Sequence, residues 1–216
     1  MTKQLANYTK IEEQMNTITH ALGIPLGIIA LIQCTHLAWQ YDWFIRIAAV
    51  LYGFSLIAMY LVSTIYHGVK PSMTKIRLRT LDHCTIYFLI AGTYSPILLS
   101  VVRAINPSVA IGLLIMEWGL GILAVILTAI DLKKYFVFSM ICYIFMGWGI
   151  MLFPQTTLAA IPSTGFVLLL SGGIVYTIGA ILYGVGKKIA YVHSLFHLFV
   201  LAGSILQYCS ITFTIL

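Results

Sequence analysis

The segment IAYVHSLFHLFVLAGSILQY, residues 189–208, is long and apolar enough to cross a membrane as one helix. A spanning helix needs about 20 predominantly apolar residues. Two histidines, His193 and His197, interrupt the segment four positions apart, which places them on one face of a helix. Ionisable side chains are costly inside a membrane and usually mark a functional or paired position. The segment therefore predicts a membrane protein with a site built around two imidazoles.

The whole chain shares this apolar character. Of its 216 residues, 61% are hydrophobic and 8% are charged, whereas a soluble domain has about 45–50% apolar and about 25% charged residues. This composition predicts an integral membrane protein without a large soluble domain. Lysine and arginine outnumber aspartate and glutamate by 12 to 6, an excess that in a membrane protein encodes orientation and does not indicate a nucleic-acid partner. The four cysteines form no C-x-x-C pair and are expected to pack as small apolar side chains.

Glycine, proline and charged residues divide the chain into seven apolar segments. The expected fold class is an all-α membrane protein, a seven-transmembrane helix bundle over residues 20–216, preceded by a polar cytoplasmic segment over residues 1–19. The expected spans are residues 20–40, 44–66, 82–102, 108–130, 135–153, 164–185 and 192–214.

Lysine and arginine are distributed very unequally between the two sides of this bundle. One side receives only Arg46 and Arg103. Because segments rich in lysine and arginine tend to stay in the cytoplasm, the other side is predicted to be cytoplasmic. The N-terminus is then inside and, with an odd number of spans, the C-terminus is outside. The basic residues of the cytoplasmic side are Lys3, Lys10, Lys70, Lys75, Arg77, Arg79, Lys133, Lys134, Lys187 and Lys188.

Apolar residues recur at spacings of three and four ahead of the first expected span. This pattern predicts a short amphipathic helix lying on the cytoplasmic face of the membrane. An ordinary extension of the first span explains the pattern equally well. The residues are Leu5, Tyr8, Ile11, Met15 and Ile18.

Three of the expected spans bring polar residues to the same membrane level. Ser63 and His67 lie four positions apart at the cytoplasmic end of the second span, on one helix face. Asp82 stands at the cytoplasmic start of the third span. His193 and His197 open the seventh span on the same side. The sequence therefore predicts that these five residues share one site.

These side chains suit a divalent transition metal. Imidazole is a common ligand for such ions, and the H-x-x-x-H spacing lets two ring nitrogens reach one ion. Three neutral histidines and one open position match catalytic zinc, whose fourth ligand is a water with a pKa lowered to about 7. Asp82 would hold this water and shuttle its proton, and Ser63 would stabilise an oxyanion or orient a ligand. The H-x-x-x-H pair alone also fits histidines that are merely tolerated near an interface.

The chain resembles the hemolysin III branch of the progestin and adipoQ receptor superfamily over about residues 12–214. The resemblance implies a seven-helix protein in which His67, His193 and His197 hold Zn²⁺ near the cytoplasmic face. It also implies that Asp82 binds the zinc water and that Ser63 lies beside it. The motifs that carry it are EEQMNTITHALG (12–23), STIYHG (63–68), LDHCTIYFLIAGTYSP (81–96) and YVHSLFH (191–197).

The function implied by this resemblance is hydrolysis. Similarity to alkaline ceramidases implies a zinc-dependent, ceramidase-like amidase, so we expect hydrolysis of an amide or ester of a membrane lipid by zinc-activated water. The expected location is the bacterial inner (plasma) membrane. Two alternatives stay open. One is a membrane receptor or stress sensor with structural zinc, and the other is a cytolysin-like, channel-forming protein.

Further polar residues have less definite roles. The run Glu13, Asn16 and His20 belongs to the family pattern and would support the metal ligands or line the cytoplasmic mouth, although a solvated helix end explains it equally well. Glu117 lies near the middle of the fourth expected span, where a charge is costly. We expect it to be protonated or paired, as a structural acid or as part of a proton relay. His83 is expected to pack or to contact headgroups.

Overall fold

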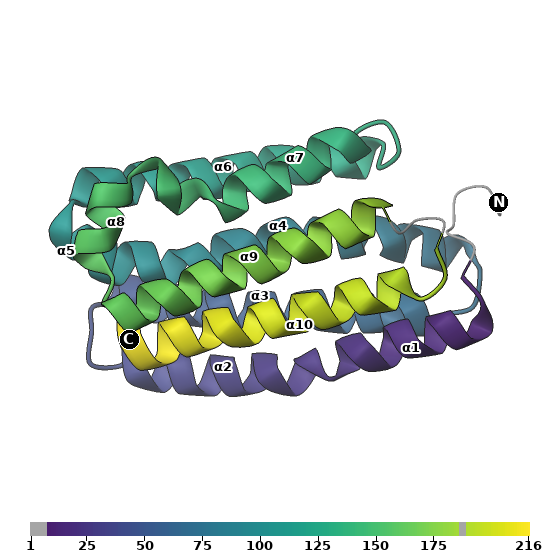
Figure 1. Cartoon of the computed structure of the whole chain (residues 1–216), viewed down its shortest axis with the longest axis horizontal. Helices are drawn as coiled ribbons and strands as arrows, with labels where there is room; N and C mark the ends of the chain where they lie inside the picture. The colour runs from purple at the N-terminus through teal and green to yellow at the C-terminus, as the bar shows by residue number, and fades with distance from the viewer. Residues whose placement is uncertain (1–7, 186–188) are drawn as a thin grey trace.

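The computed structural model describes residues 8–185 and 189–216, and every regular element within them is helical (Figure 1). Lys3, Leu5, Lys187 and Lys188, which the sequence assigned to the first segment and to a basic loop, lie outside the described residues. The α-helices are α1 (Lys10–Ala21), α2 (Gly23–Ala38), α3 (Trp43–Gly68), α4 (Met73–Ile97), α5 (Arg103–Ile105), α6 (Pro107–Ile130), α7 (Phe136–Gly147), α8 (Pro154–Ala160), α9 (Ser163–Val185) and α10 (Val192–Ser210). The other helical turns are η2 (Leu98–Val102), η3 (Gly149–Leu152) and η5 (Ile211–Ile215).

Among the described residues, 6 helical segments are long and apolar enough to cross a membrane. α7 lies where the fifth of the seven expected spans was placed, and it is apolar but only 12 residues long. The chain is therefore a multi-pass membrane protein, and α7 is the element in which it differs from seven full-length spans. The 6 segments are Lys10–Ala38, Trp43–Gly68, Met73–Ile105, Pro107–Ile130, Ser163–Gly184 and Val192–Phe213.

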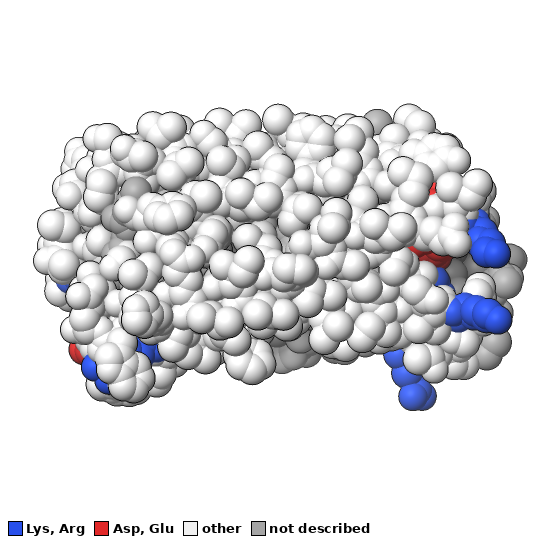
Figure 2. All heavy atoms as spheres, turned by 90° about the horizontal axis from the view of Figure 1, so that it is seen from below, with Lys and Arg blue, Asp and Glu red and all other residues white. Residues whose placement is uncertain are grey.

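The long helices lie side by side along the long axis of the molecule (Figure 1). α3 packs against α1, α2 and α4, and α10 packs against α9 and α1. α6 and α7 lie side by side on the outside of the bundle (Figure 1). α9 begins at the end of the bundle that carries α5 and α8. Figure 2 shows lysine and arginine gathered near the two ends of one face, with uncharged surface between them. Such a surface is suited to the apolar interior of a membrane.

Glycines bring α2 and α3 close together. A Cβ atom on Gly53 would lie 2.4 Å from the Cα atom of Leu31, and one on Gly27 would lie 2.9 Å from the backbone nitrogen of Ile57. Small residues are favoured where membrane helices approach closely. Ala30 of α2 and Ala49 of α3 are fully buried and belong to one hydrophobic core cluster. This close packing holds α3, whose end carries Ser63 and His67, against α2.

The third span begins earlier than the sequence predicted. Its helix, α4, starts at Met73 and not near residue 82, because the Ser72 hydroxyl accepts the Lys75 N–H and caps the helix. Lysine and arginine are good helix formers, so the basic run after the cap is helical. Asp82 therefore lies inside the helix and not at its start. The helix continues past Pro96 and widens into the π-helical turn η2.

α1 is amphipathic, and its polar face points into the bundle. Glu12, Asn16 and His20 are buried, whereas Ile11 and Ile18 are 59% and 60% exposed. α1 runs on into α2, so residues 10–38 form a single candidate span. The inward polar face places hydrogen-bonding groups beside the ends of α3 and α10.

Candidate metal centre

The three histidines that the sequence singled out converge in space. His193 Nε2 lies 3.3 Å from His67 Nε2 and 3.0 Å from His197 Nε2. Four tetrahedral ligands at the zinc–nitrogen distance of about 2.0–2.1 Å are separated from one another by about 3.3 Å. His67 and His197 are buried and His193 is half-buried. The spacing and the burial therefore fit a group that could hold one metal ion.

Hydrogen bonds at Nδ1 determine the tautomer of two of these imidazoles. His67 Nδ1 lies 2.7 Å from Glu13 Oε2, and His197 Nδ1 lies 3.2 Å from the backbone oxygen of Asn16. A carboxylate and a carbonyl only accept, so each Nδ1 carries the proton and donates it. Each Nε2 then presents its lone pair to the shared centre. Partners of this kind orient metal-binding histidines and strengthen them as ligands.

Aromatic rings hold the third imidazole. The ring of Tyr8 stacks on that of His193, with centroids 5.0 Å apart and an angle of 18° between the planes. Tyr183 and Phe196 each place a ring centroid 5.6 Å from that of His193. Tyr8 precedes α1, and burial raises the pKa of its phenol well above the usual value, so the ring is neutral. Packing thus fixes the orientation of the His193 ring.

The start of α10 is tied to α1 by the backbone of Tyr191. This residue has a left-handed conformation, with φ at 65°, that is uncommon outside glycine. Its N–H donates to Glu12 Oε1 at 3.0 Å, while Glu12 Oε2 accepts from the Thr9 N–H at 2.8 Å. One carboxylate therefore links the first turn of α1 to the turn that positions His193.

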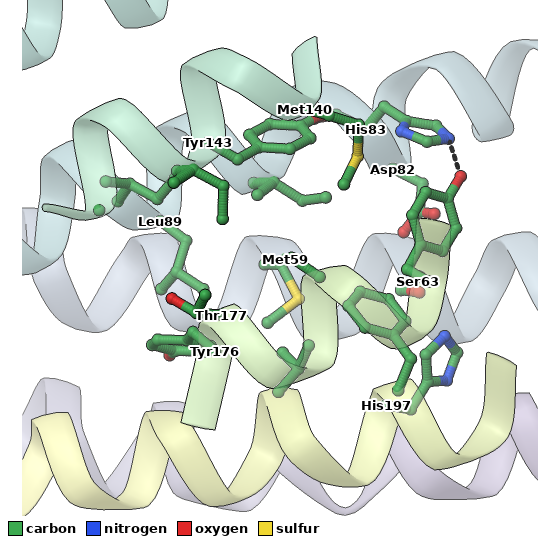
Figure 3. A pocket seen from close by; sticks show the side chains of 18 of the residues that line it. Met59, Ser63, Asp82, His83, Leu89, Met140, Tyr143, Tyr176, Thr177 and His197 are labelled. Carbon is green, nitrogen blue, oxygen red and sulfur yellow. Dashed lines mark hydrogen bonds between the residues drawn. The ribbon is translucent and has the colours of Figure 1, made fainter. Parts of the chain in front are cut away.

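Ser63 and Asp82 lie on the wall of a cavity that reaches the histidines (Figure 3). The Ser63 hydroxyl donates a hydrogen bond to the Asp82 carboxylate. The positively charged Arg79 lies near enough to Asp82 to attract its charge. Ser63 is fully buried, and Asp82 is half-buried. The structure thus brings all five predicted residues to one end of the bundle.

The cavity has a volume of about 1300 Å³ and extends from this polar end into the middle of the bundle. Met59, Leu89 and Met140 line its central part (Figure 3). Leu169 of α9 and Gln207 of α10 line the part farther from the histidines. A cavity that is polar near the histidines and largely apolar beyond them is suited to an amphiphile with a long chain.

Three polar residues of α1 contact the histidines, and one of them, Asn16, does so through its backbone oxygen, which accepts from His197 Nδ1. Glu13 accepts from His67, as described above, and Asn16 Oδ1 accepts from the Ser194 hydroxyl at 2.5 Å. The His20 ring stacks on that of His197, with centroids 3.5 Å apart. The run Glu13, Asn16 and His20 therefore surrounds the metal-binding group from the side of α1.

Sequence reasoning missed several residues of this site. Thr19 Oγ1 lies 3.2 Å from His197 Nδ1, and Lys75 Nζ lies 2.8 Å from Glu13 Oε1. Lys75 was assigned only to the orientation of the chain, because a buried lysine looks like any other basic residue in the sequence. The recurrence of polar residues at positions 9, 12, 13, 16, 19 and 20 was the signal that could have located the inward face of α1.

Two further polar residues lie outside the group that could hold a metal. Glu117 is 1% exposed, and neither of its carboxyl oxygens has a hydrogen-bond partner among the described residues. A Cβ atom at Gly149 would lie 2.4 Å from one of these oxygens, so the carboxyl group occupies the space that the missing side chain of Gly149 leaves, just after α7. His83 lines the cavity, where its Nε2 lies 3.4 Å from the Tyr183 hydroxyl (Figure 3).

Comparison with known proteins agrees with the motifs. The sequence model of the haemolysin-III related family matches residues 8–208. The chain is 35% identical over 208 residues to the hemolysin-3 homolog of Bacillus subtilis (strain 168), a match that covers 95% of each chain. It is 35% identical over 219 residues to hemolysin-3 of Bacillus cereus, covering 100% of this chain and 98% of that protein.

A human protein is also similar. The monocyte to macrophage differentiation factor of Homo sapiens is 30% identical over 217 residues, which cover 94% of this chain and 84% of the human protein. The family match includes α1, α3 and α4, and it also includes the part of α10 that carries His193 and His197. The resemblance seen in the sequence is therefore confirmed, and the chain belongs to the haemolysin-III related family.

Proposed function

We propose that this protein is a zinc-dependent hydrolase that cleaves an amide or ester bond of a membrane lipid. The observation that carries the proposal is the convergence of three Nε2 atoms beside a serine–aspartate pair, at the polar end of a long, largely apolar cavity. His67, His193 and His197 would hold the metal. Bound zinc supplies a Lewis acid that polarises a carbonyl and lowers the pKa of water.

The residues around the metal would divide the remaining work. The Asp82 carboxylate would take a proton from the attacking water and pass it to the leaving nitrogen or oxygen. The Ser63 hydroxyl holds this carboxylate in place through its hydrogen bond. Met59, Leu89 and other apolar side chains of the cavity would bind the acyl chain and exclude water from the reacting bond.

The number of protein ligands supports catalysis over a structural site. A structural zinc site is normally closed by four protein ligands, whereas a catalytic site keeps one position open. Among the described residues, the group that could hold a metal consists of His67, His193 and His197, and Asp82 is not part of it. Three ligands leave room for a water or a substrate carbonyl.

The proposed topology has seven crossings, a cytoplasmic N-terminus and a metal centre near the cytoplasmic face of the bacterial inner membrane. Two features support it. The chain returns through α7 and η3 to the end of the bundle where α9 begins (Figure 1). Most of the basic residues lie at the end of the bundle nearest the histidines, in the first turns of α4 and in the loops that follow α3 and α6, as in segments retained in the cytoplasm.

The proposal is tested by metal analysis and a hydrolysis assay on the full-length protein in lipid nanodiscs. We expect one zinc ion per chain and release of fatty acid from a ceramide or from a glycerolipid ester. The variant with His67, His193 and His197 all changed to alanine is expected to lose both zinc and hydrolysis. A wild-type protein that carries no zinc, or a variant that hydrolyses lipid at the wild-type rate, would contradict the proposal.

A further inference from the structure

We propose that Lys75 is a positioning residue for the metal centre, which acts on His67 through Glu13. The inference rests on the proposed metal site and adds a residue that neither the family motifs nor the positive-inside pattern assigns to it. Lys75, Glu13 and His67 come from α4, α1 and α3, respectively. They form a continuous chain of charged and polar contacts behind the Nε2 atom that faces the shared centre.

The Lys75 side chain is buried and makes three contacts. Its Nζ atom lies 2.8 Å from Glu13 Oε1, 2.9 Å from the Val69 oxygen and 3.3 Å from the His67 oxygen. The side chain is 4% exposed. An ammonium group has three donors and is costly to bury without partners. Here all three donors have an acceptor, so the group is held in one place.

Glu13 transmits this position to the imidazole. One carboxylate oxygen accepts from Lys75, and the other accepts from His67 Nδ1 at 2.7 Å. Because the two oxygens of a planar carboxylate are a fixed distance apart, holding one of them restricts the positions that the other can take. Lys75 therefore holds His67 at two points, at its backbone oxygen directly and at its ring through Glu13.

Orientation alone does not explain why Lys75 is buried. Arg77 lies two residues along the same helix and is exposed, which satisfies the preference for basic residues on the cytoplasmic side. Lys75 instead points into the junction between the end of α3 and the first turn of α1. Its ring neighbour there is Tyr66, whose centroid lies 5.2 Å from Nζ. The contacts of Lys75 are therefore those of a residue that holds its neighbours, Glu13 and His67, in place.

The test measures the zinc dissociation constant of the full-length protein by competition with a chelator. Residues that support metal-binding histidines typically contribute about 10–100-fold to metal affinity. We expect Lys75→Gln to weaken zinc binding by a factor in this range and Lys75→Arg to recover much of it, because the guanidinium still donates to a carboxylate. Arg77→Gln is the matched control and is expected to bind zinc as the wild type does.

A spectroscopic measurement separates positioning from a purely structural role. In the zinc-free wild type, the side-chain ¹⁵N shifts of His67 should report a proton on Nδ1. In Lys75→Gln they should report a mixture of tautomers, because Glu13 is no longer fixed. A purely structural role would lower the unfolding temperature without changing these shifts or the zinc affinity of the folded protein.

A second variant guards against failure to fold. Removing one partner of a buried ion pair is destabilising, whereas replacing both partners is often tolerated. The double variant Glu13→Gln with Lys75→Met removes both charges. We expect it to fold and to bind zinc about as weakly as Glu13→Gln alone, because the two residues act on the same histidine.

The outcomes distinguish this inference from the proposed function. If His193→Ala loses zinc while Lys75→Gln and the double variant bind it as tightly as the wild type, the role of Lys75 is wrong and the metal site stands. An equal loss in Arg77→Gln would also overturn that role. If the wild type binds no zinc, or His193→Ala binds it unchanged, the metal centre is wrong and the inference fails with it.

Discussion

At the scale of single residues, His67, His193 and His197 present the same ring nitrogen to a shared centre but are held in three different ways. A carboxylate fixes His67, a backbone oxygen fixes His197, and aromatic rings fix His193. A hydrogen bond is directional and sets both tautomer and orientation, whereas ring stacking restricts orientation alone. Packing therefore holds the ring of His193, whose Nδ1 has no hydrogen-bond partner among the described residues.

The role of Asp82 is tested by Asp82→Asn. Asparagine keeps the shape of the side chain and can still bond with Ser63, but it cannot take up a proton. We expect the variant to retain one zinc ion per chain and to lose lipid hydrolysis by about 10²–10⁴-fold, the usual contribution of general acid–base catalysis. Zinc content and initial rate are measured on the same preparation. Loss of zinc in this variant would indicate that Asp82 is itself a ligand.

Asp42 offers a test at the opposite end of the bundle. Its carboxylate pairs with Arg103 and accepts the N–H groups of Phe44 and Ile45, which caps α3. The hydrogen bond from Arg103 is the main reason that the pKa of Asp42 lies below its usual range. A lowered pKa means that this contribution to stability is present at neutral pH. The contribution is lost as the pH falls through the pKa of the folded state.

Arg103→Gln is therefore expected to raise the pKa of Asp42 toward its usual value, with part of the lowering retained because the helix cap remains. The measurement is a pH titration of the ¹³C shift of the Asp42 carboxyl group. Lys133→Gln, in the loop between α6 and α7, serves as the control and should leave this pKa unchanged. An unchanged pKa in Arg103→Gln would show that the pair does not persist in solution.

At the scale of elements, close packing of α2 on α3 and the inward polar face of α1 determine where the site can form. α3 ends at the site with Ser63 and His67 on its inner side, and α1 reaches that level because it continues into α2. The recurrence of apolar residues at spacings of three and four predicted a helix here, but it left open whether this helix lies on the membrane or extends the first span. Local pattern alone did not show that Glu13 would contact His67.

The α2–α3 contact is tested by Gly53→Ala. The new methyl group would lie 2.4 Å from Leu31 Cα and 2.8 Å from its nitrogen, so the backbone of α2 would have to move. We expect a loss of about 1–3 kcal/mol in the free energy of unfolding, as for other overpacked sites. Denaturation in detergent followed by circular dichroism measures it.

Gly112→Ala on α6 is the matched control, because a Cβ atom there meets nothing within 4 Å. Alanine is favoured over glycine in a helix by about 1 kcal/mol, so this variant should be at least as stable as the wild type. If Gly53→Ala were as stable as Gly112→Ala, α2 and α3 would not be in close contact.

At the scale of the whole molecule, the protein has two unlike ends separated by an uncharged region (Figure 2). The histidine group lies at the end where α1 begins, and the Asp42–Arg103 pair lies at the other end. One cavity connects the histidines with the middle of the bundle. If the proposed hydrolysis occurs, the bond to be cleaved would have to lie at the end of the bundle that carries the histidines.

The orientation is tested by labelling introduced cysteines with a maleimide that does not cross membranes. Ser108→Cys lies at the start of α6, and Lys133→Cys lies in the loop after it; both positions are exposed. We expect Ser108→Cys to react in intact cells and Lys133→Cys to react only after permeabilisation. Both variants carry Cys209→Ser, because Cys209 is half-buried, and Cys209→Ser without an introduced cysteine gives the background, because Cys34, Cys84 and Cys142 are buried. The reverse pattern would invert the proposed topology.

The sequence by itself determined the helical membrane class, most of the helix positions and the identity of the three histidines. These features depend on local composition and on residue spacing along one helix, which can be read without a partner. The start of α4 was placed too late, because charged residues next to an apolar segment look like a loop even when a serine cap makes them helical.

Only the tertiary structure decided which faces point inward. In a membrane protein, apolar side chains face the lipid as well as the core, so an apolar stripe does not reveal the buried side. For this reason the apolar pattern of α1 did not identify its buried side, and the burial of Lys75 and the cavity beside Asp82 became visible only when the helices were packed together. Contacts among residues far apart in the chain depend on helix packing, and no local pattern encodes them.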